Sequence, residues 1–149
     1  MIKLRLTALV VAVIGLTVST YLAVVKLVHQ DVLCFAGADD CNIVNNSAYS
    51  MWRGIPVAIL GVLGYVVILA LLFIMGKQKI ESSVIILALF GITVFGTVYS
   101  LYLTYVELFI IHAVCPWCLT SAIAMFVLLI ISAIILGRSK VINTIHQEE

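Results

Sequence analysis

Two cysteines separated by two residues give the clearest chemical signal in the chain. Cys115-Pro-Trp-Cys118 stands at the start of a long apolar run. At the N-terminus of a helix, partial positive charge and free N–H groups stabilise a thiolate, the species that attacks disulfides. A disulfide within so short a loop constrains the unfolded chain little, so the spacing favours reversible redox exchange over a static staple.

Haem and metal chemistry fit this motif less well. A c-type haem attachment site would carry histidine directly after the second cysteine, where Leu119 stands. A zinc site would need two further ligands at suitable spacing, and the other two cysteines are far away in sequence. We therefore interpret Cys115 and Cys118 as a redox pair and expect no metal site.

The other two cysteines, Cys34 and Cys41, lie seven residues apart, beside Gly37 and the acidic residues 39–40. By themselves they are typical of an ordinary disulfide outside the cytoplasm. Paired with a second dithiol on the same face of a membrane, they fit an electron relay better. A glycine-containing loop can present one cysteine to a soluble partner and the other to the Cys-Pro-Trp-Cys pair.

The composition indicates that a membrane holds these cysteines. Of the 149 residues, 64% are hydrophobic and 10% are charged, and the mean hydropathy is +1.28. A soluble domain carries about 25% charged residues, so a water-soluble core protein is excluded. The net charge of +1, without a basic patch, gives no reason to expect a nucleic-acid partner.

Four apolar stretches are long enough to cross a bilayer as helices. A span needs about 20 apolar residues, and lipid offers no partner to unpaired backbone groups. We expect an all-α integral membrane protein, a single membrane domain over 1–149 with a four-helix bundle and an outer loop, 29–54, that caps the site. The expected helices cover about 6–28, 55–75, 82–106 and 116–136, and residues 108–114 join the last two.

Positive charge predicts the orientation, because basic residues gather on the cytoplasmic side. Six of the eight basic residues fall at the two termini or between the second and third spans. They are Lys3, Arg5, Lys77, Lys79, Arg138 and Lys140. We therefore expect a multi-pass protein of the cell inner or plasma membrane with both termini cytoplasmic and all four cysteines extracytoplasmic.

The order and surroundings of the cysteines suggest a known family. The features are the loop pair Cys34 and Cys41, Ser47, Trp52-Arg-Gly-Ile-Pro56, Gly61-x-x-Gly64-Tyr65 and Cys115-Pro-Trp-Cys118. With these features the chain resembles the vitamin K epoxide reductase family, in its bacterial disulfide-generating branch. The loop pair comes first and the membrane-embedded pair last, whereas the other quinone-coupled bacterial disulfide generator has the reverse order.

The resemblance implies an enzyme that promotes disulfide formation in exported proteins. A reduced thioredoxin-like partner attacks the loop disulfide at Cys34, Cys41 passes electrons to Cys115, and Cys118 faces a membrane quinone such as menaquinone or ubiquinone. On the same basis we expect the partner to be a separate extracytoplasmic dithiol oxidoreductase, with no fused thioredoxin-like domain in this chain.

The resemblance also implies a quinone site, to which we assign Ser47, Trp52, Tyr65 and Trp117. Ser47 resembles the family's hydroxyl residue on the loop segment that caps the quinone. Two features of vertebrate members are absent: their quinone-binding asparagine has no counterpart on the second helix, and their tyrosine four residues after the last cysteine is replaced by Ala122. These differences favour plain quinone reduction over epoxide reduction.

Two titratable residues precede the last cysteine pair, and each has a simpler explanation. His112 could move protons during thiol chemistry, but a lone interfacial histidine is more often solvated. Glu107 lies where the third helix is expected to leave the membrane, and solvation is again the simpler explanation. Two other functions remain open: a non-enzymatic membrane subunit with two static disulfides, and a soft-metal carrier that uses thiolates.

Overall fold

Four long helices dominate the protein, as the sequence predicts. The computed structural model describes residues 2–34, 40–77 and 83–147. Gly37, Asp39, Lys79 and Ser82, which enter the expectations above, lie outside these residues. The long helices are α1 (Ile2–Val28), α3 (Val57–Lys77), α4 (Ser83–Val106) and α5 (Pro116–Gln147). In the described part of the chain, all four are long and apolar enough to cross a membrane.

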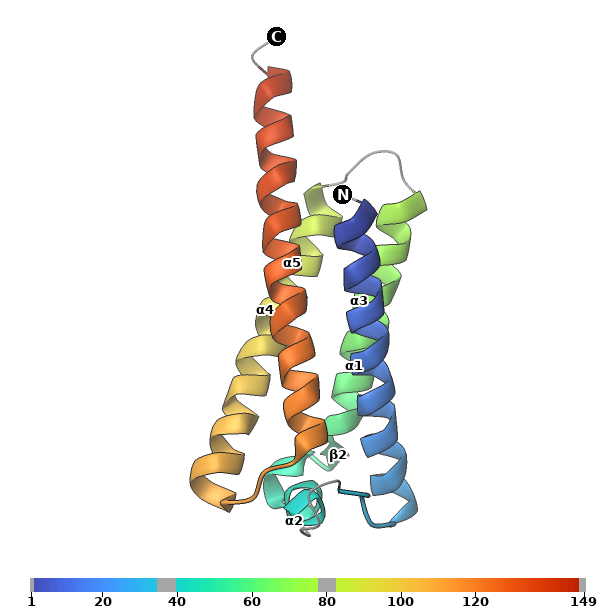
Figure 1. Ribbon diagram of the computed structural model, residues 1–149, viewed down its shortest axis with the longest axis vertical. Coiled ribbons are helices and arrows are strands. Elements are labelled where there is room, and N and C mark those ends of the chain that lie inside the picture. Colours follow the sequence, from blue (N-terminus) through green and yellow to red (C-terminus); the bar gives the residue numbers. More distant parts are fainter. Residues whose placement is uncertain (1, 35–39, 78–82, 148–149) are drawn as a thin grey trace.

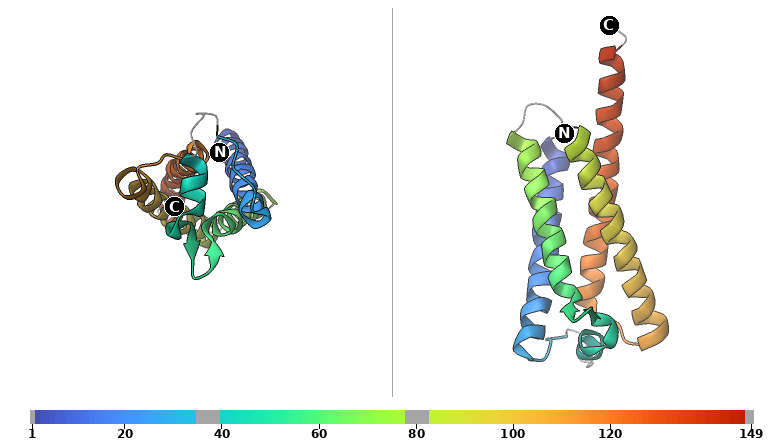
Figure 2. Two further views of the ribbon diagram at one scale, coloured as in Figure 1. Left: turned by 90° about the horizontal axis from the view of Figure 1, so that it is seen from below. Right: turned by 180° about the vertical axis from the view of Figure 1, so that it is seen from behind.

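The helices form an up-and-down bundle (Figures 1 and 2). The most extensive contacts join α4 to α5, α1 to α3 and α1 to α5, while α3 and α4 contact each other less. Large apolar side chains such as Leu87 (61% exposed) and Leu63 (56% exposed) face outward. In water such a surface would be a liability, but against lipid tails it is the expected outer face of a spanning bundle.

Two hydrophobic clusters hold the bundle together at different levels. The larger one is built from all four long helices and includes Ala12, Tyr65, Leu89 and Leu128. The smaller one gathers the outer end of α1, the outer connection and the segment before α5, and it contains both Cys41 and Cys115. Cys41 and Cys115 are therefore part of the packed interior.

The outer connection is more ordered than the expected loop. It contains α2 (Asp40–Asn46), a 3-10 turn η1 (Ala48–Ser50) and a hairpin of β1 (Met51–Trp52) and β2 (Ile55–Pro56). The hairpin turn residues Arg53 and Gly54 have φ angles of 51° and 84°. Positive φ at both turn positions matches the right-handed twist of a two-residue hairpin, and glycine adopts it without strain.

Helix α1 begins four residues before its expected start, and α3 is shifted by two residues because residues 55–56 form β2; the largest differences from the hydropathy-based boundaries lie at two other places. After α4, a π-helical turn, η2 (Glu107–Ile111), continues the helix where a connecting segment was expected from residue 108. The backbone N–H of Ala113 donates to the Glu107 carbonyl at 3.2 Å, and His112 has a left-handed backbone that ends the turn. Helix α5 runs on to Gln147, past the expected end at 136, because hydropathy marks where the bilayer ends and not where backbone hydrogen bonding stops.

The two ends of the helical bundle are formed by different elements. Helix α1 begins and α5 ends at one end, whereas α2 and the hairpin lie at the other (Figure 1). All four cysteines belong to the end that carries α2. The two helix ends at the termini and the cysteines thus lie at opposite ends of the bundle, and the face of the membrane on which each lies stays a prediction.

Candidate redox site

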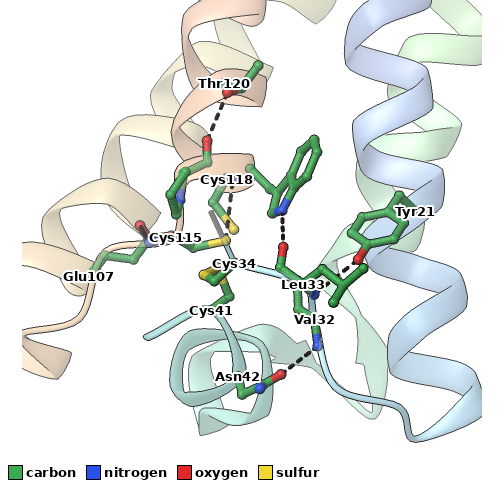
Figure 3. The surroundings of a disulfide bond; sticks show 12 residues. Tyr21, Val32, Leu33, Cys34, Cys41, Asn42, Glu107, Cys115, Cys118 and Thr120 are labelled. Atoms are coloured by element: carbon green, nitrogen blue, oxygen red, sulfur yellow. Dashed lines mark hydrogen bonds between the residues drawn. A yellow bond between two sulfur atoms is a disulfide. The ribbon is translucent and has the colours of Figure 1, made fainter. Parts of the chain in front are cut away.

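A disulfide in the outer connection lies beside the cysteine that begins the α5 motif (Figure 3). Cys34 and Cys41 are disulfide-bonded with a Cα–Cα distance of 6.0 Å. Cys41 and Cys115 are both 0% exposed and share one hydrophobic cluster, while Cys34 and Cys118 are only partly buried. Cys41 and Cys115 therefore lie in one buried apolar cluster, and Cys34 and Cys118 keep some exposed surface.

Hydrogen bonds hold the segment that leads into the loop disulfide. The Val32 N–H donates to the Asn42 side-chain oxygen at 2.7 Å, and the Leu33 N–H donates to the Tyr21 hydroxyl at 3.1 Å (Figure 3). The Trp117 indole N–H donates to the Leu33 carbonyl at 2.9 Å. The segment is thus tied to α2, α1 and α5 at once, which fixes the disulfide against the start of α5.

The two cysteines of α5 interact with each other at the helix N-terminus. The Cys118 N–H donates to Cys115 Sγ at 3.4 Å, and Pro116 occupies the first helical position, where the missing N–H costs nothing. The hydrogen bond from the Cys118 side chain lowers the pKa of Cys115 below its ordinary value, although burial and the Glu107 carboxylate act in the opposite direction. Cys115 is therefore the cysteine of the pair whose pKa its surroundings lower.

An apolar cavity of about 330 Å³ lies inside the bundle next to Cys118. Residues of all four long helices form its walls, and the outer connection covers it. Ser47, Trp52 and Tyr65, three of the four residues assigned to the quinone, line this cavity, as does Cys118. Trp117, the fourth, is not among the described residues that line it: the ring packs on Tyr21 with centroids 5.3 Å apart.

The volume and lining of the cavity suit a quinone ring. Ligand pockets usually enclose about 300–1,000 Å³ of mainly apolar wall with a few polar groups. The polar groups here include the hydroxyls of Ser19, Ser47 and Ser121. No three His, Cys, Asp or Glu side chains come together as a possible metal site within the described ranges.

Tyr65 forms part of the cavity wall and is completely buried. Its hydroxyl donates to the Ser121 carbonyl at 2.9 Å and lies 3.1 Å from the Ser121 Oγ. On the other side the ring packs against Gly15, where an added Cβ would come within 2.2 Å of two ring carbons. Ser121 was not anticipated from the sequence, but its position three residues after Cys118 on α5 places both on one helix face.

Lys26 connects the outer end of α1 to the part of the chain that covers the cavity. Its ammonium group donates to the Asn45 carbonyl, to the Asn46 side-chain oxygen at 3.4 Å and to the Ser50 hydroxyl at 3.1 Å. Ser47, which lies between Asn46 and Ser50 in the chain, donates its hydroxyl to the Val44 carbonyl at 2.8 Å. No sequence motif marks this role, because the partners lie about 20 residues away from Lys26 in the chain.

Fold and site together define a class: multi-pass membrane proteins in which a loop disulfide meets a helix-borne Cys-x-x-Cys pair beside an apolar cavity. The model of the vitamin K epoxide reductase family matches residues 6–133. The chain therefore belongs to the vitamin K epoxide reductase family, which confirms the resemblance found in the sequence.

One relative carries a functional name. A thiol-disulfide oxidoreductase of Arabidopsis thaliana is 32% identical to this chain over 119 residues, which are 76% of this chain and 32% of the relative. This chain thus spans about a third of the length of the curated relative that it matches.

Proposed function

We propose that the protein is a membrane thiol–quinone oxidoreductase that oxidises a thioredoxin-like dithiol partner and thereby promotes disulfide formation in exported proteins. Membership of the family and the name of the Arabidopsis relative support the thiol-oxidoreductase part. The quinone, the partner and the path of the electrons follow from the chemistry of the four cysteines and their surroundings.

One observation carries the proposal: the graded burial of the four sulfurs. Cys34 is partly exposed, Cys41 and Cys115 are fully buried in one cluster, and Cys118 lines the apolar cavity. A disulfide chain in this order can take electrons from a soluble dithiol at one end and deliver them to a lipid-soluble acceptor at the other. Two static disulfides would give no reason for Cys41 and Cys115 to share one buried cluster.

The proposed path balances as two successive dithiol–disulfide exchanges. A thiolate of the partner attacks Cys34, Cys41 leaves, and the second partner thiol resolves the mixed disulfide. The Cys41 thiolate then attacks Cys115 of the oxidised helix pair, and Cys118 leaves. Finally Cys34 attacks Cys41, which re-forms the loop disulfide and leaves Cys115 and Cys118 reduced with two electrons and two protons.

A quinone would supply the electron sink, because its conversion to quinol takes up two electrons and two protons. The cavity residues that would hold its ring are Ser47, Trp52 and Tyr65, with Cys118 at the wall that the ring would face. We further propose that the membrane orients the cysteines outward, since basic residues Arg5, Lys77 and Arg138 lie on helix ends away from them.

A trapped crosslink tests the path. Exchange between the pairs passes through a Cys41–Cys115 disulfide, which accumulates when both resolving sulfurs are absent. In a Cys34→Ala, Cys118→Ala double variant we expect proteolysis between α3 and α4 to leave the two halves joined until reductant is added. The matched control, Cys34→Ala, Cys115→Ala, should yield fragments that separate without reductant.

The acceptor is tested separately by mixing reduced protein with quinones under anaerobic conditions. We expect one disulfide to form for each quinol produced. Thiol titration measures the disulfide, and absorbance measures the quinol. Halves that separate in the first experiment would mean that the loop pair is a static staple. Absence of quinone-dependent thiol loss in the second would remove the quinone from the proposal.

A further inference from the structure

A buried carboxyl group lies next to the helix pair, and the proposed path does not use it. Glu107 is 5% exposed and one of its carboxylate oxygens accepts the Cys115 N–H at 3.5 Å (Figure 3). The same side chain makes a hydrogen bond with the Cys118 side chain and lines the apolar cavity. Glu107 therefore contacts the backbone of Cys115, the thiol of Cys118 and the space that the electron acceptor would occupy.

A local distortion of the helix presents this carboxyl group to the site. Glu107 begins the π-helical turn η2, and its carbonyl accepts the N–H groups of both His112 and Ala113. The left-handed backbone of His112 closes the turn, and Cys115 follows three residues later. π turns are frequent at functional sites, and the extra residue redirects a side chain that an unbroken α-helix would point elsewhere.

The surroundings of Glu107 leave it without a counter-charge. Among the described residues, the titratable groups that interact with its carboxyl group are Cys115 and Cys118 of α5. From α2, which packs on η2, the neighbouring cluster contributes Cys41, which is held in the disulfide. Lys26 is engaged by the outer connection, and His112 is exposed with its ring near the Ile110 carbonyl.

Accepting a hydrogen bond from the Cys115 N–H does not by itself require an acid at position 107. Burying a carboxyl group without a basic partner is costly, and a neutral amide could accept the Cys115 N–H equally well. An acid in such a place is of use when protons must move, because it can take a proton and release it again within a closed site.

We propose that Glu107 carries a proton from the Cys115–Cys118 pair to the electron acceptor in the cavity. The inference rests on the proposed function. As the two thiols form a disulfide they release two electrons and two protons. The carboxylate accepts one of these protons from the Cys118 thiol or, by exchange within the pair, from Cys115, and delivers it to the acceptor. The other proton passes directly from Cys118, which lines the cavity, to the acceptor, so Glu107 ends each cycle in its starting form.

The test uses Glu107→Gln, which keeps the shape and the acceptor oxygen but cannot carry the proton. In the full-length protein we expect quinone-dependent thiol oxidation to fall about 100-fold, the usual contribution of general acid–base catalysis. Glu107→Asp should recover part of this loss because it restores the acid. His112→Asn should keep the wild-type rate, since asparagine tolerates the left-handed backbone and His112 lies outside the relay.

A second readout needs no quinone. Removing a negative charge beside Cys115 favours its thiolate, so alkylation of Cys115 by iodoacetamide at neutral pH in quinone-free Glu107→Gln should be roughly tenfold faster than in the wild type. A defect that only opened the site around the buried Cys115 would speed alkylation equally at every pH, whereas loss of the charge shifts the pH midpoint of alkylation to a lower value. Faster alkylation together with slower oxidation is therefore the expected signature.

The possible outcomes separate this inference from the proposed function. Wild-type oxidation rates in Glu107→Gln would overturn the proton relay alone, as would slower oxidation with unchanged or slower alkylation. A wild-type protein that reduces no quinone would overturn both. If Glu107→Gln does not fold, Glu107→Asp decides: we expect a slower rate with a larger solvent deuterium isotope effect, and an unchanged rate and isotope effect would refute the relay.

Discussion

Substituting Gly15 by alanine should destabilise the protein by forcing Tyr65 out of the cavity wall. In the present structure a Cβ at position 15 would lie 2.2 Å from Cε1 and Cζ of Tyr65 and 2.6 Å from its hydroxyl oxygen. Ordinary carbon contacts are about 3.5–4.0 Å, so the ring or the helices must move by more than about 1 Å. The ring cannot swing freely, because it is 0% exposed and hydrogen-bonded to Ser121.

The size of the effect follows from two opposing contributions. Overpacking a tight interior costs about 1–3 kcal/mol, and a broken hydrogen bond that leaves a buried hydroxyl unpaired costs about 1–3 kcal/mol more. Alanine in place of glycine gains about 1 kcal/mol of helix propensity in water. We expect a net loss of about 2–4 kcal/mol, which shifts the thermal midpoint by several degrees.

The assay compares Gly15→Ala with Gly91→Ala in detergent by thermal unfolding. Gly91 lies within α4 and an added Cβ there meets no atom within 4 Å, so this substitution should be neutral or stabilising. Gly15→Ala should also weaken quinone binding, because Tyr65 lines the cavity. Equal midpoints for both variants, or a higher one for Gly15→Ala, would refute the packing of Tyr65 against α1.

Four further predictions concern the redox path and the cover of the cavity. A purified Cys115→Ser variant should show a broad visible charge-transfer band from a Cys118 thiolate beside bound quinone. Acid should bleach this band, because it protonates the thiolate. A band in Cys118→Ser instead would mean that Cys115, and not Cys118, faces the quinone. Lys26→Met loses three hydrogen bonds to the outer connection. It should raise the KM for quinone roughly tenfold, which corresponds to about 1.4 kcal/mol, with little change in kcat. An unchanged KM would show that Lys26 does not hold the outer connection over the cavity. Cys41→Ala should leave Cys34 to capture the dithiol partner as a mixed disulfide on non-reducing gels, and no adduct should form when Cys34 is also replaced. After mild reduction, a membrane-impermeant maleimide on intact cells should label Cys34 or Cys41, whereas labelling only after the membrane is broken would contradict the proposed orientation.

The family and the four spans could be predicted from the sequence because both depend on local features. About 20 consecutive apolar residues commit a segment to the bilayer whatever its neighbours are, and the four stretches found in this way correspond to α1, α3, α4 and α5. The spacing of Cys115 and Cys118, together with Cys34 and Cys41, indicated the family that the comparison confirms. The roles assigned to the individual cysteines stay predictions.

Other features depend on contacts between distant segments, and the sequence did not reveal them. Lys26 reaches residues about 20 positions later, and Gly15 matters because Tyr65, on another helix, packs against it. The assignment of Trp117 to the quinone site followed from its place inside the motif. Side chains around a helix point in different directions, however, so Cys118 lines the cavity whereas Trp117 packs on Tyr21.

The position of Glu107 shows where sequence reasoning ends. From the sequence, Glu107 was a residue near the expected end of the third helix, and solvation was the simpler explanation. Hydropathy could not foresee the π turn that continues α4 and directs this carboxyl group inward, 3.5 Å from the Cys115 N–H. Composition and spacing determined which groups this chain brings to a membrane, and only the packing of the helices decided which of them meet, because burial and hydrogen bonding depend on the whole fold.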